Sequence, residues 1–166
     1  SDKELITAVR EGRKNEFKEY GFGSTPDPQD EKTFTDSKIK WEKQDQGKHK
    51  VLKEWYRELI RMRQTLAPLR NFEKKDFQAE PLGEEGLMLS RKASDDEQLL
   101  CLLNFSDSPV DFTVSNELKT FRKILNSKES KWCIEKKEIN SLPPEKITNG
   151  QKIILPPVSV LVYSST

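Results

Sequence analysis

The run Leu99-Leu100-Cys101-Leu102-Leu103 decides the fold of this chain. It is apolar at every position, and Asn104-Phe105-Ser106 follows it, where a strand can end. A short apolar run bounded by turn-forming residues is typical of a strand that is covered on both faces. We therefore expect residues 99–103 to form the central strand of a sheet.

Further short apolar runs surround this strand after residue 70, with Gly, Pro, Asn, Asp and Ser between them. They lie at 77–82, 86–91, 99–105, 110–114, 121–126, 132–134, 153–155 and 158–163. Alternation with a period of two indicates strands, and no helical pattern separates them. Strands without helices between them are joined by hairpins or Greek-key crossings. Residues 71–166 are therefore predicted to form an antiparallel β-sandwich domain.

The front part of the chain has helical periodicity instead. Leu5, Val9 and Phe17 recur at helical spacing, and Asp27-Pro28 is typical of the start of a second, short helix. From His49 onward a wide apolar stripe continues to Pro68; it consists of Leu52, Trp55, Tyr56, Leu59, Ile60, Met62 and Leu66. The fold class is thus predicted as α+β, with helices over residues 1–70. A stripe this wide needs a large partner, which makes a missing neighbour plausible.

The composition excludes several classes of partner. The chain has 29 basic and 28 acidic residues with mixed signs, so no concentrated basic face is expected to bind nucleic acid or an anionic membrane surface. Its apolar runs are far shorter than the ~20 residues that span a bilayer. With no signal-peptide pattern at its start, the protein is predicted to be cytoplasmic. The absence of an initiating Met indicates a piece of something larger.

Residues that could carry chemistry are few. One histidine, His49, and two cysteines, Cys101 and Cys133, fit no metal motif, so neither a metal nor a cofactor is expected. No catalytic residue is predicted either, because the candidate carboxylates stand beside Lys or Arg, which opposes the raised pKa of a general acid. These carboxylates are Glu54, Glu58, Glu84, Glu85, Asp95, Asp96 and Glu97.

The three tryptophans differ in their expected roles. Trp41 lies in an irregular stretch between helices, where loops often carry function, so it is the candidate substrate-binding residue. Trp55 belongs to the apolar stripe of its helix and is expected in the core. Trp132 is expected to pack inside the sandwich, and His49 to be exposed or capping at a helix start.

Several motifs resemble a known family. The segments concerned are Leu5-Ile6-Thr7-Ala8-Val9-Arg10-Glu11-Gly12-Arg13-Lys14-Asn15-Glu16-Phe17, Pro26-Asp27-Pro28-Gln29-Asp30, Ser37-Lys38-Ile39-Lys40-Trp41 and Trp55-Tyr56-Arg57-Glu58-Leu59-Ile60-Arg61-Met62-Arg63. They resemble the maltooligosyltrehalose trehalohydrolases of the α-amylase superfamily, glycoside hydrolase family 13. Leu155-Pro156-Pro157-Val158-Ser159-Val160-Leu161-Val162 is similar to the C-terminal sandwich that follows the catalytic barrel in this superfamily.

The resemblance implies a particular organisation. Residues 1–70 would be the helical end of a catalytic (β/α)8 barrel, and residues 71–166 the C-terminal sandwich domain. The catalytic carboxylates of the superfamily lie on barrel strands upstream of the matched region, so this chain alone is expected to be inactive. Its expected partner is the missing barrel of the same chain. α-Glucan or maltooligosyltrehalose would be bound through the parent enzyme.

Two alternative functions stay open. The sandwich alone does not separate a trehalohydrolase from a 1,4-α-glucan branching enzyme, although the segment from Pro26 to Trp41 favours the former. A stand-alone carbohydrate-binding module is a further alternative, and the low aromatic content of 8% argues against it. The exposed helix stripe also predicts dimers of the isolated chain that have no physiological role.

Overall fold

The computed structural model describes residues 2–19, 25–115, 120–133 and 142–165. The chain divides into two compact units, Ser1–Glu42 and Lys43–Thr166, and each is described by itself. In the described residues no helix is long and apolar enough to cross a membrane.

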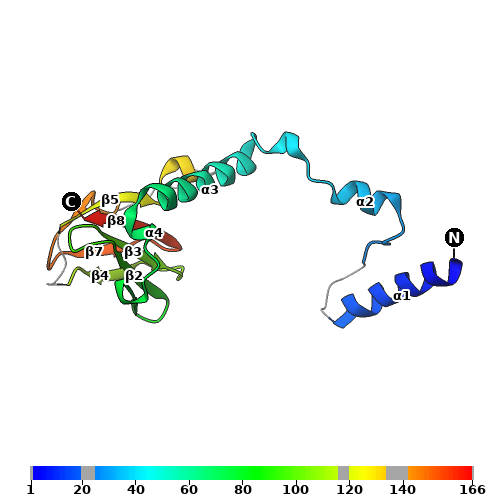
Figure 1. Ribbon diagram of the computed structural model, residues 1–166, viewed down its shortest axis with the longest axis horizontal. Coiled ribbons are helices and arrows are strands. Elements are labelled where there is room, and N and C mark those ends of the chain that lie inside the picture. Colours follow the sequence, from blue (N-terminus) through cyan, green and yellow to red (C-terminus); the bar gives the residue numbers. More distant parts are fainter. Residues whose placement is uncertain (1, 20–24, 116–119, 134–141, 166) are drawn as a thin grey trace. The chain divides into compact units, whose positions relative to one another are not determined.

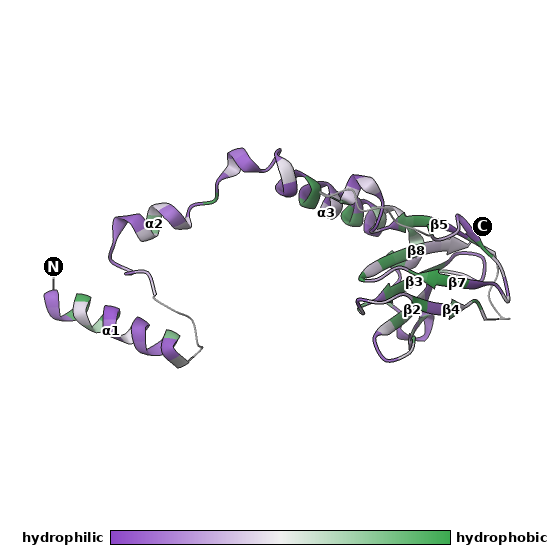
Figure 2. Cartoon of the chain, turned by 180° about the vertical axis from the view of Figure 1, so that it is seen from behind, coloured by the Kyte–Doolittle hydropathy of each residue, from purple (hydrophilic) through white to green (hydrophobic). Residues whose placement is uncertain are grey.

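The first unit is helical. It contains α1 (Lys3–Glu19), α2 (Glu31–Ser37) and the start of the 3-10 turn η1 (Trp41–Lys43). Asp30 caps α2 by accepting a hydrogen bond from the Lys32 backbone N–H at 2.8 Å. The predicted cap at Asp27 is wrong, because Asp27 precedes the helix in a turn: its carboxylate accepts from the Gln29 backbone N–H at 2.9 Å and pairs with the Arg10 guanidinium at 2.7 Å, and α2 begins only after Asp30. Figure 2 shows that α1 and α2 are largely hydrophilic.

The second unit begins with helices. These are α3 (Gly47–Thr65) and α4 (Ala67–Arg70), followed by the 3-10 turn η2 (Lys74–Asp76). The backbone N–H of Leu66 bonds to the Met62 carbonyl at 2.9 Å and closes α3. Pro68 then lies in the first turn of α4. Backbone N–H groups in the first turn have no carbonyl partner within the helix, so the missing N–H of proline costs no hydrogen bond there. Proline thus starts a new short helix as well as ending the preceding one.

Eight strands follow in the described residues. They are β1 (Phe77–Pro81), β2 (Gly86–Lys92), β3 (Gln98–Asn104), β4 (Val110–Thr113), β5 (Phe121–Asn126), β6 (Lys146–Ile147), β7 (Lys152–Leu155) and β8 (Ser159–Ser165). One sheet has the order β1-β2-β3-β8-β5-β6, and a second sheet pairs β4 with β7. All pairings are antiparallel, as the sequence predicts.

The central strand β3 is covered on both faces, as its apolar run predicts. Leu100 and Leu102 share one buried core with the two-stranded sheet, whereas Leu99 and Cys101 face the other way. That second face packs against α3 and α4, which lie along the large sheet in Figure 1. The large sheet therefore forms the middle layer between helices and the small sheet.

One strand prediction needs correction, and one observed strand was not predicted. Trp132 belongs to the 3-10 turn η3 (Ser130–Trp132) and not to a strand; Ile134, also assigned to that strand, lies outside the described residues. The short strand β6 has only a two-residue ladder with Phe121 and Arg122, too short for a recognisable alternation in the sequence. No closed barrel occurs among the described residues. The predicted boundary between residues 70 and 71 would separate the end of such a barrel from the sandwich domain, and it stays a prediction.

Candidate functional site

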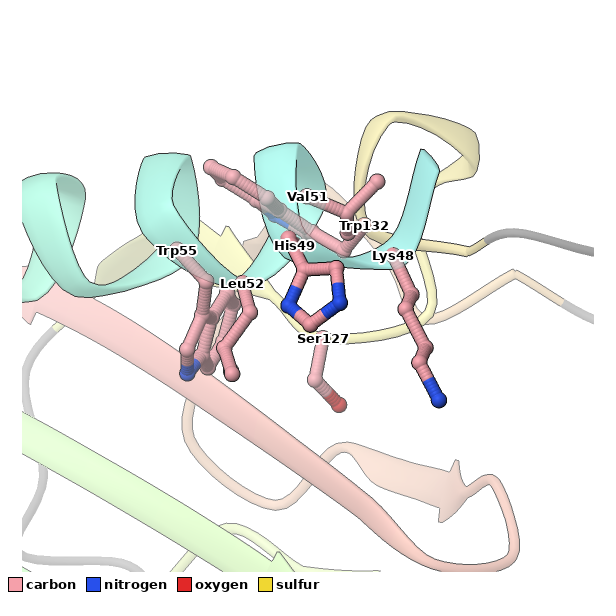
Figure 3. A pocket seen from close by; sticks show the side chains of 7 residues that line it. All are labelled: Lys48, His49, Val51, Leu52, Trp55, Ser127 and Trp132. Carbon is pink, nitrogen blue, oxygen red and sulfur yellow. The ribbon is translucent and has the colours of Figure 1, made fainter. Parts of the chain in front are cut away.

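A groove lies along the N-terminal half of α3. Its volume is about 560 Å³, and its lining residues are Lys48, His49, Val51, Leu52, Trp55, Ser127 and Trp132. The first five come from the first turns of α3, and the last two follow β5. Figure 3 shows His49, Leu52 and Trp55 extending from the helix to the same side, with Ser127 below His49 and its hydroxyl pointing away from the helix.

Two indole rings make one wall of the groove. The rings of Trp55 and Trp132 meet edge to face, with centroids 5.1 Å apart and planes at 79°. This arrangement matches the quadrupoles of the two rings and adds to the burial of their surfaces. The Lys131 ammonium lies 4.9 Å from the Trp132 ring centroid, and the Trp132 backbone N–H bonds to the Glu129 carbonyl at 2.8 Å. The wall is therefore held in place from several directions.

One polar atom of the Trp132 side chain is unusual. Trp132 Nε1 is buried and has no hydrogen-bond partner among the described residues. An unpaired buried donor costs free energy, because water satisfies the same group in the unfolded chain.

The opposite wall is fixed by strand β8. The Ser127 backbone N–H donates to the Val160 carbonyl at 2.9 Å, and the Val160 N–H donates to Ser127 Oγ at 2.9 Å. The Ser127 hydroxyl thus accepts a backbone hydrogen bond and retains a proton that it can donate. The groove thus combines hydrocarbon walls with the polar ends of Lys48, His49 and Ser127.

A second apolar surface lies beside the groove on α3. Leu52, Tyr56 and Ile60 are 54, 59 and 55% exposed, whereas Met62 is buried against the sheet with Trp55 and Leu59 beside it. Helical geometry of about 3.6 residues per turn places the two stripes roughly a quarter turn apart. We call Leu52, Tyr56 and Ile60 the outer stripe. A second apolar stripe on one helix is typical of a surface that another body covers.

Two carboxylates of the second unit, Glu58 and Asp45, are held in ion pairs. Arg61 donates to Glu58 at 2.6 Å, and this hydrogen bond holds the pKa of Glu58 below its usual range. Asp45 has a lowered pKa for the same reason, through its hydrogen bond from Lys53 at 2.7 Å. A general acid in glycoside hydrolysis requires the opposite shift. In the part of the chain described, three or more metal-binding side chains nowhere gather into a cation site.

The predicted site residues have different outcomes. Trp41 is 66% exposed in η1 and belongs to the first unit, so its role in substrate binding stays a prediction. Trp55 packs against the buried core as expected, and its partly exposed ring lines the groove. His49 is exposed as expected, but it also lines the groove.

Sequence reasoning missed the groove as a whole. The helical spacing of Lys48, Leu52 and Trp55 could have placed them on one side of α3. The contact of Trp55 with Trp132 joins distant parts of the chain, and no local pattern reveals it.

Comparisons with known proteins identify the relatives. No profile of a known protein family matches the chain. The malto-oligosyltrehalose trehalohydrolase of Mycobacterium tuberculosis (strain H37Rv) is 32% identical over 117 residues, which cover 69% of this chain and 20% of the relative. The resemblance to trehalohydrolases is confirmed. The trehalohydrolase of Deinococcus radiodurans is 41% identical over 77 residues, 45% of this chain and 13% of the relative. That of Rhizobium sp. (strain M-11) is 44% identical over 68 residues, 40% of this chain and 11% of the relative.

Solved structures support the fold. A mutant of the trehalulose synthase MutB of Pseudomonas mesoacidophila MX-45, in complex with glucose, matches with a TM-score of 0.51 and 18% identity over 69% of this chain and 18% of that chain. A second MutB mutant, from crystals soaked with trehalulose, gives 0.50 at the same identity over 68% of this chain and 17% of that one. The chain spans about a fifth or less of the length of these trehalohydrolases and synthases. Its helices and antiparallel sheets fit a C-terminal region of such an enzyme.

Proposed function

We propose that this chain is the non-catalytic C-terminal portion of a maltooligosyltrehalose trehalohydrolase, and that its sheet unit packs against the catalytic barrel and stabilises it. The parent enzyme would hydrolyse an α-1,4 bond of a maltooligosyltrehalose and release trehalose. The chain itself would contribute no catalytic carboxylate. A cytoplasmic location belongs to the same proposal.

The outer stripe of α3 carries this proposal. Trp55, Leu59 and Met62 already attach the helix to its own sheet, so the sheet unit has no need of Tyr56 and Ile60 for its core. Exposed aromatic and branched side chains at helical spacing present apolar surface to water, which is unfavourable, and covering them with another protein surface lowers the free energy. In a (β/α)8 barrel each helix covers the strands from outside, and an outer stripe of this kind is what such a helix turns inward.

The state of two carboxylates supports the proposal that the chain is non-catalytic. Glu58 and Asp45 have lowered pKa values because Arg61 and Lys53 donate hydrogen bonds to them, so both stay ionised at neutral pH. An ionised carboxylate has no proton to donate and therefore cannot act as a general acid.

A branching enzyme is the second candidate for the parent. The trehalohydrolase relatives favour the first candidate. A carbohydrate-binding module is less well supported for the chain as a whole, because Trp55 is largely engaged in the core. An assay for released trehalose, against one for new α-1,6 branches, separates the two enzyme candidates.

A chimaera tests the proposal. The matched region of the Deinococcus radiodurans trehalohydrolase is replaced by this chain, and trehalose release and thermal stability are measured beside those of the same enzyme truncated before that region. We expect activity and a raised Tm in the chimaera, and no trehalose release from the chain alone. Release by the chain alone, or a chimaera no more stable than the truncated enzyme, would contradict the proposal.

Paired substitutions give this experiment its control. Ile60→Asp introduces a charge on the outer stripe, and Ile154→Asp introduces one at a 48% exposed position on β7, on the other side of the large sheet. Only Ile60→Asp is expected to lower the Tm of the chimaera to that of the truncated enzyme. Equal effects would mean that the stripe has no special role.

A further inference from the structure

Val158 has a backbone conformation that is unusual for its side chain. It lies in the turn between β7 and β8, and its φ of 44° is the one positive value outside glycine among the described residues. The branched Cβ of valine crowds the backbone in this left-handed region, which glycine adopts freely. A strained residue of this kind requires a physical reason.

Hydrogen bonds within the sheet unit impose this conformation. The Val158 backbone N–H donates to the Ser106 carbonyl at 2.9 Å. The Pro156 carbonyl accepts from the Asn104 amide at 2.9 Å and from Ser159 Oγ at 2.6 Å. All three bonds would form equally well with glycine at position 158, because none of them uses the valine side chain. The folding of the unit therefore accounts for the backbone of Val158 but not for its side chain.

The Val158 side chain gains little from burial in its own unit. It is 55% exposed, and it belongs to neither buried core cluster of the sheet unit. Burial of an apolar side chain can offset backbone strain, and here that contribution is largely missing. A strained apolar side chain that is exposed to water indicates a contact that the isolated chain lacks.

A second exposed apolar side chain lies beside Val158. The register of β3 with β8 ends with Asn104 opposite Ser159, so the next position outward places Phe105 opposite Val158. Phe105 is 60% exposed. We call Phe105 and Val158 the end patch. It lies at the end of the large sheet where β3 finishes and β8 begins.

We propose that the end patch is a second contact surface for the catalytic barrel of the parent enzyme. The inference rests on the proposed function, and it names a contact that α3 does not make. The matched region makes up 20% of the Mycobacterium tuberculosis relative, so most of such an enzyme lies outside it and offers a large covering surface.

The end patch is close enough to the outer stripe for one body to reach both. Val160, two residues after Val158, exchanges two hydrogen bonds of 2.9 Å with Ser127. Ser127 in turn lines the groove together with Leu52, the first residue of the outer stripe. A barrel that covers the outer stripe would therefore extend over the groove to the end patch.

Val158→Gly tests the proposal, because strain and contact predict opposite effects. In the isolated chain the equilibrium constant of unfolding in urea should fall roughly threefold or more, since the strain is relieved. In calorimetric titration into the truncated Deinococcus radiodurans enzyme, the variant should bind roughly tenfold more weakly, since it lacks the apolar side chain. A destabilised isolated chain, or an unchanged affinity, would overturn the proposal.

Two alanine variants give the controls. Val158→Ala removes apolar surface but keeps a Cβ in the strained conformation, so it should weaken binding without the gain in stability. Ile154→Ala changes a residue of similar exposure, 48 against 55%, that faces away from the core on β7. Its affinity should equal that of the unchanged chain. Equal losses of affinity in the two variants would overturn the proposal.

The results separate this inference from the proposed function. Binding that Ile60→Asp abolishes and Val158→Ala leaves unchanged would keep the docking of α3 and remove the end patch. Absence of binding by the unchanged chain would contradict both. A dimer of the isolated chain that Val158→Ala abolishes, with unchanged affinity for the enzyme, would assign the patch to a second copy and overturn the proposal. The chimaera gives a second measurement, in which Val158→Ala should lower the Tm and Ile154→Ala should not.

Discussion

At the scale of single residues, the buried side chain of Asn104 links two loops of the sheet unit. Its amide nitrogen donates to the Ser108 and Pro156 carbonyls at 2.8 and 2.9 Å. Its oxygen accepts from the Ser106 backbone N–H and hydroxyl at 2.9 and 2.8 Å. The side chain is only 1% exposed, so water cannot reach its polar atoms. These hydrogen bonds take the place of the bonds to water that the amide makes in the unfolded chain. The polarity of the amide, and not its volume alone, is therefore required.

Asn104→Asp should destabilise the sheet unit strongly. At neutral pH a carboxylate oxygen would face the Ser108 and Pro156 carbonyl oxygens in place of a donor. We expect a loss of about 3 kcal/mol or more in the free energy of unfolding, measured by urea denaturation. The loss should shrink in acid, where the protonated side chain donates again. A loss below about 1 kcal/mol at neutral pH would show that the network is dispensable.

Cys101 gives a prediction about pH. Burial raises the pKa of the Cys101 thiol from 9.0 to about 11. Between these values the unfolded chain has lost a proton that the folded chain keeps, so the free energy of unfolding should fall as pH rises through this window. Full titration corresponds to about 2–3 kcal/mol. Urea unfolding below and above the window measures this fall, and Cys101→Val should reduce it. An unchanged slope in the variant would contradict the assignment.

At the scale of elements, neighbouring positions of α3 have different roles, one in the core of the sheet unit and one on its surface. Leu59 packs into the core beside Met62, whereas Ile60 is 55% exposed on the outer stripe. Leu59→Ala should therefore reduce the free energy of unfolding of the isolated chain by about 2–3 kcal/mol through loss of buried surface. Ile60→Ala should change it by less than about 0.5 kcal/mol. Denaturation of both variants under one set of conditions checks this, and similar losses would mean that Ile60 supports the core.

The elements also show what a sequence can and cannot predict. The strand at Leu99–Leu103 and the helix that ends before Pro68 follow from local patterns, and both are observed. The cap at Asp27 was mispredicted because Asp27 and Asp30 carry the same capping chemistry three residues apart, and the helix begins after the second of them. The groove was missed for a different reason, since Trp132 reaches Trp55 only through the folding of the sheet. Long-range contacts leave no mark in local periodicity.

At the scale of the whole molecule, the outer stripe predicts self-association. Tyr56 and Ile60 are exposed in the isolated chain, and two copies could cover these surfaces by pairing. Sedimentation at low and high protein concentration should show a concentration-dependent dimer that Ile60→Asp abolishes. Ile154→Asp should leave the dimer intact. A strict monomer at both concentrations would count against this prediction.

The central claim is that α3 joins this chain to a catalytic barrel through its outer stripe. The most direct measurement is calorimetric titration of the chain into a trehalohydrolase that lacks the matching region. We predict saturable binding that Ile60→Asp abolishes and Ile154→Asp preserves, because only Ile60 belongs to the outer stripe. Absence of binding, or equal binding by both variants, would contradict the claim.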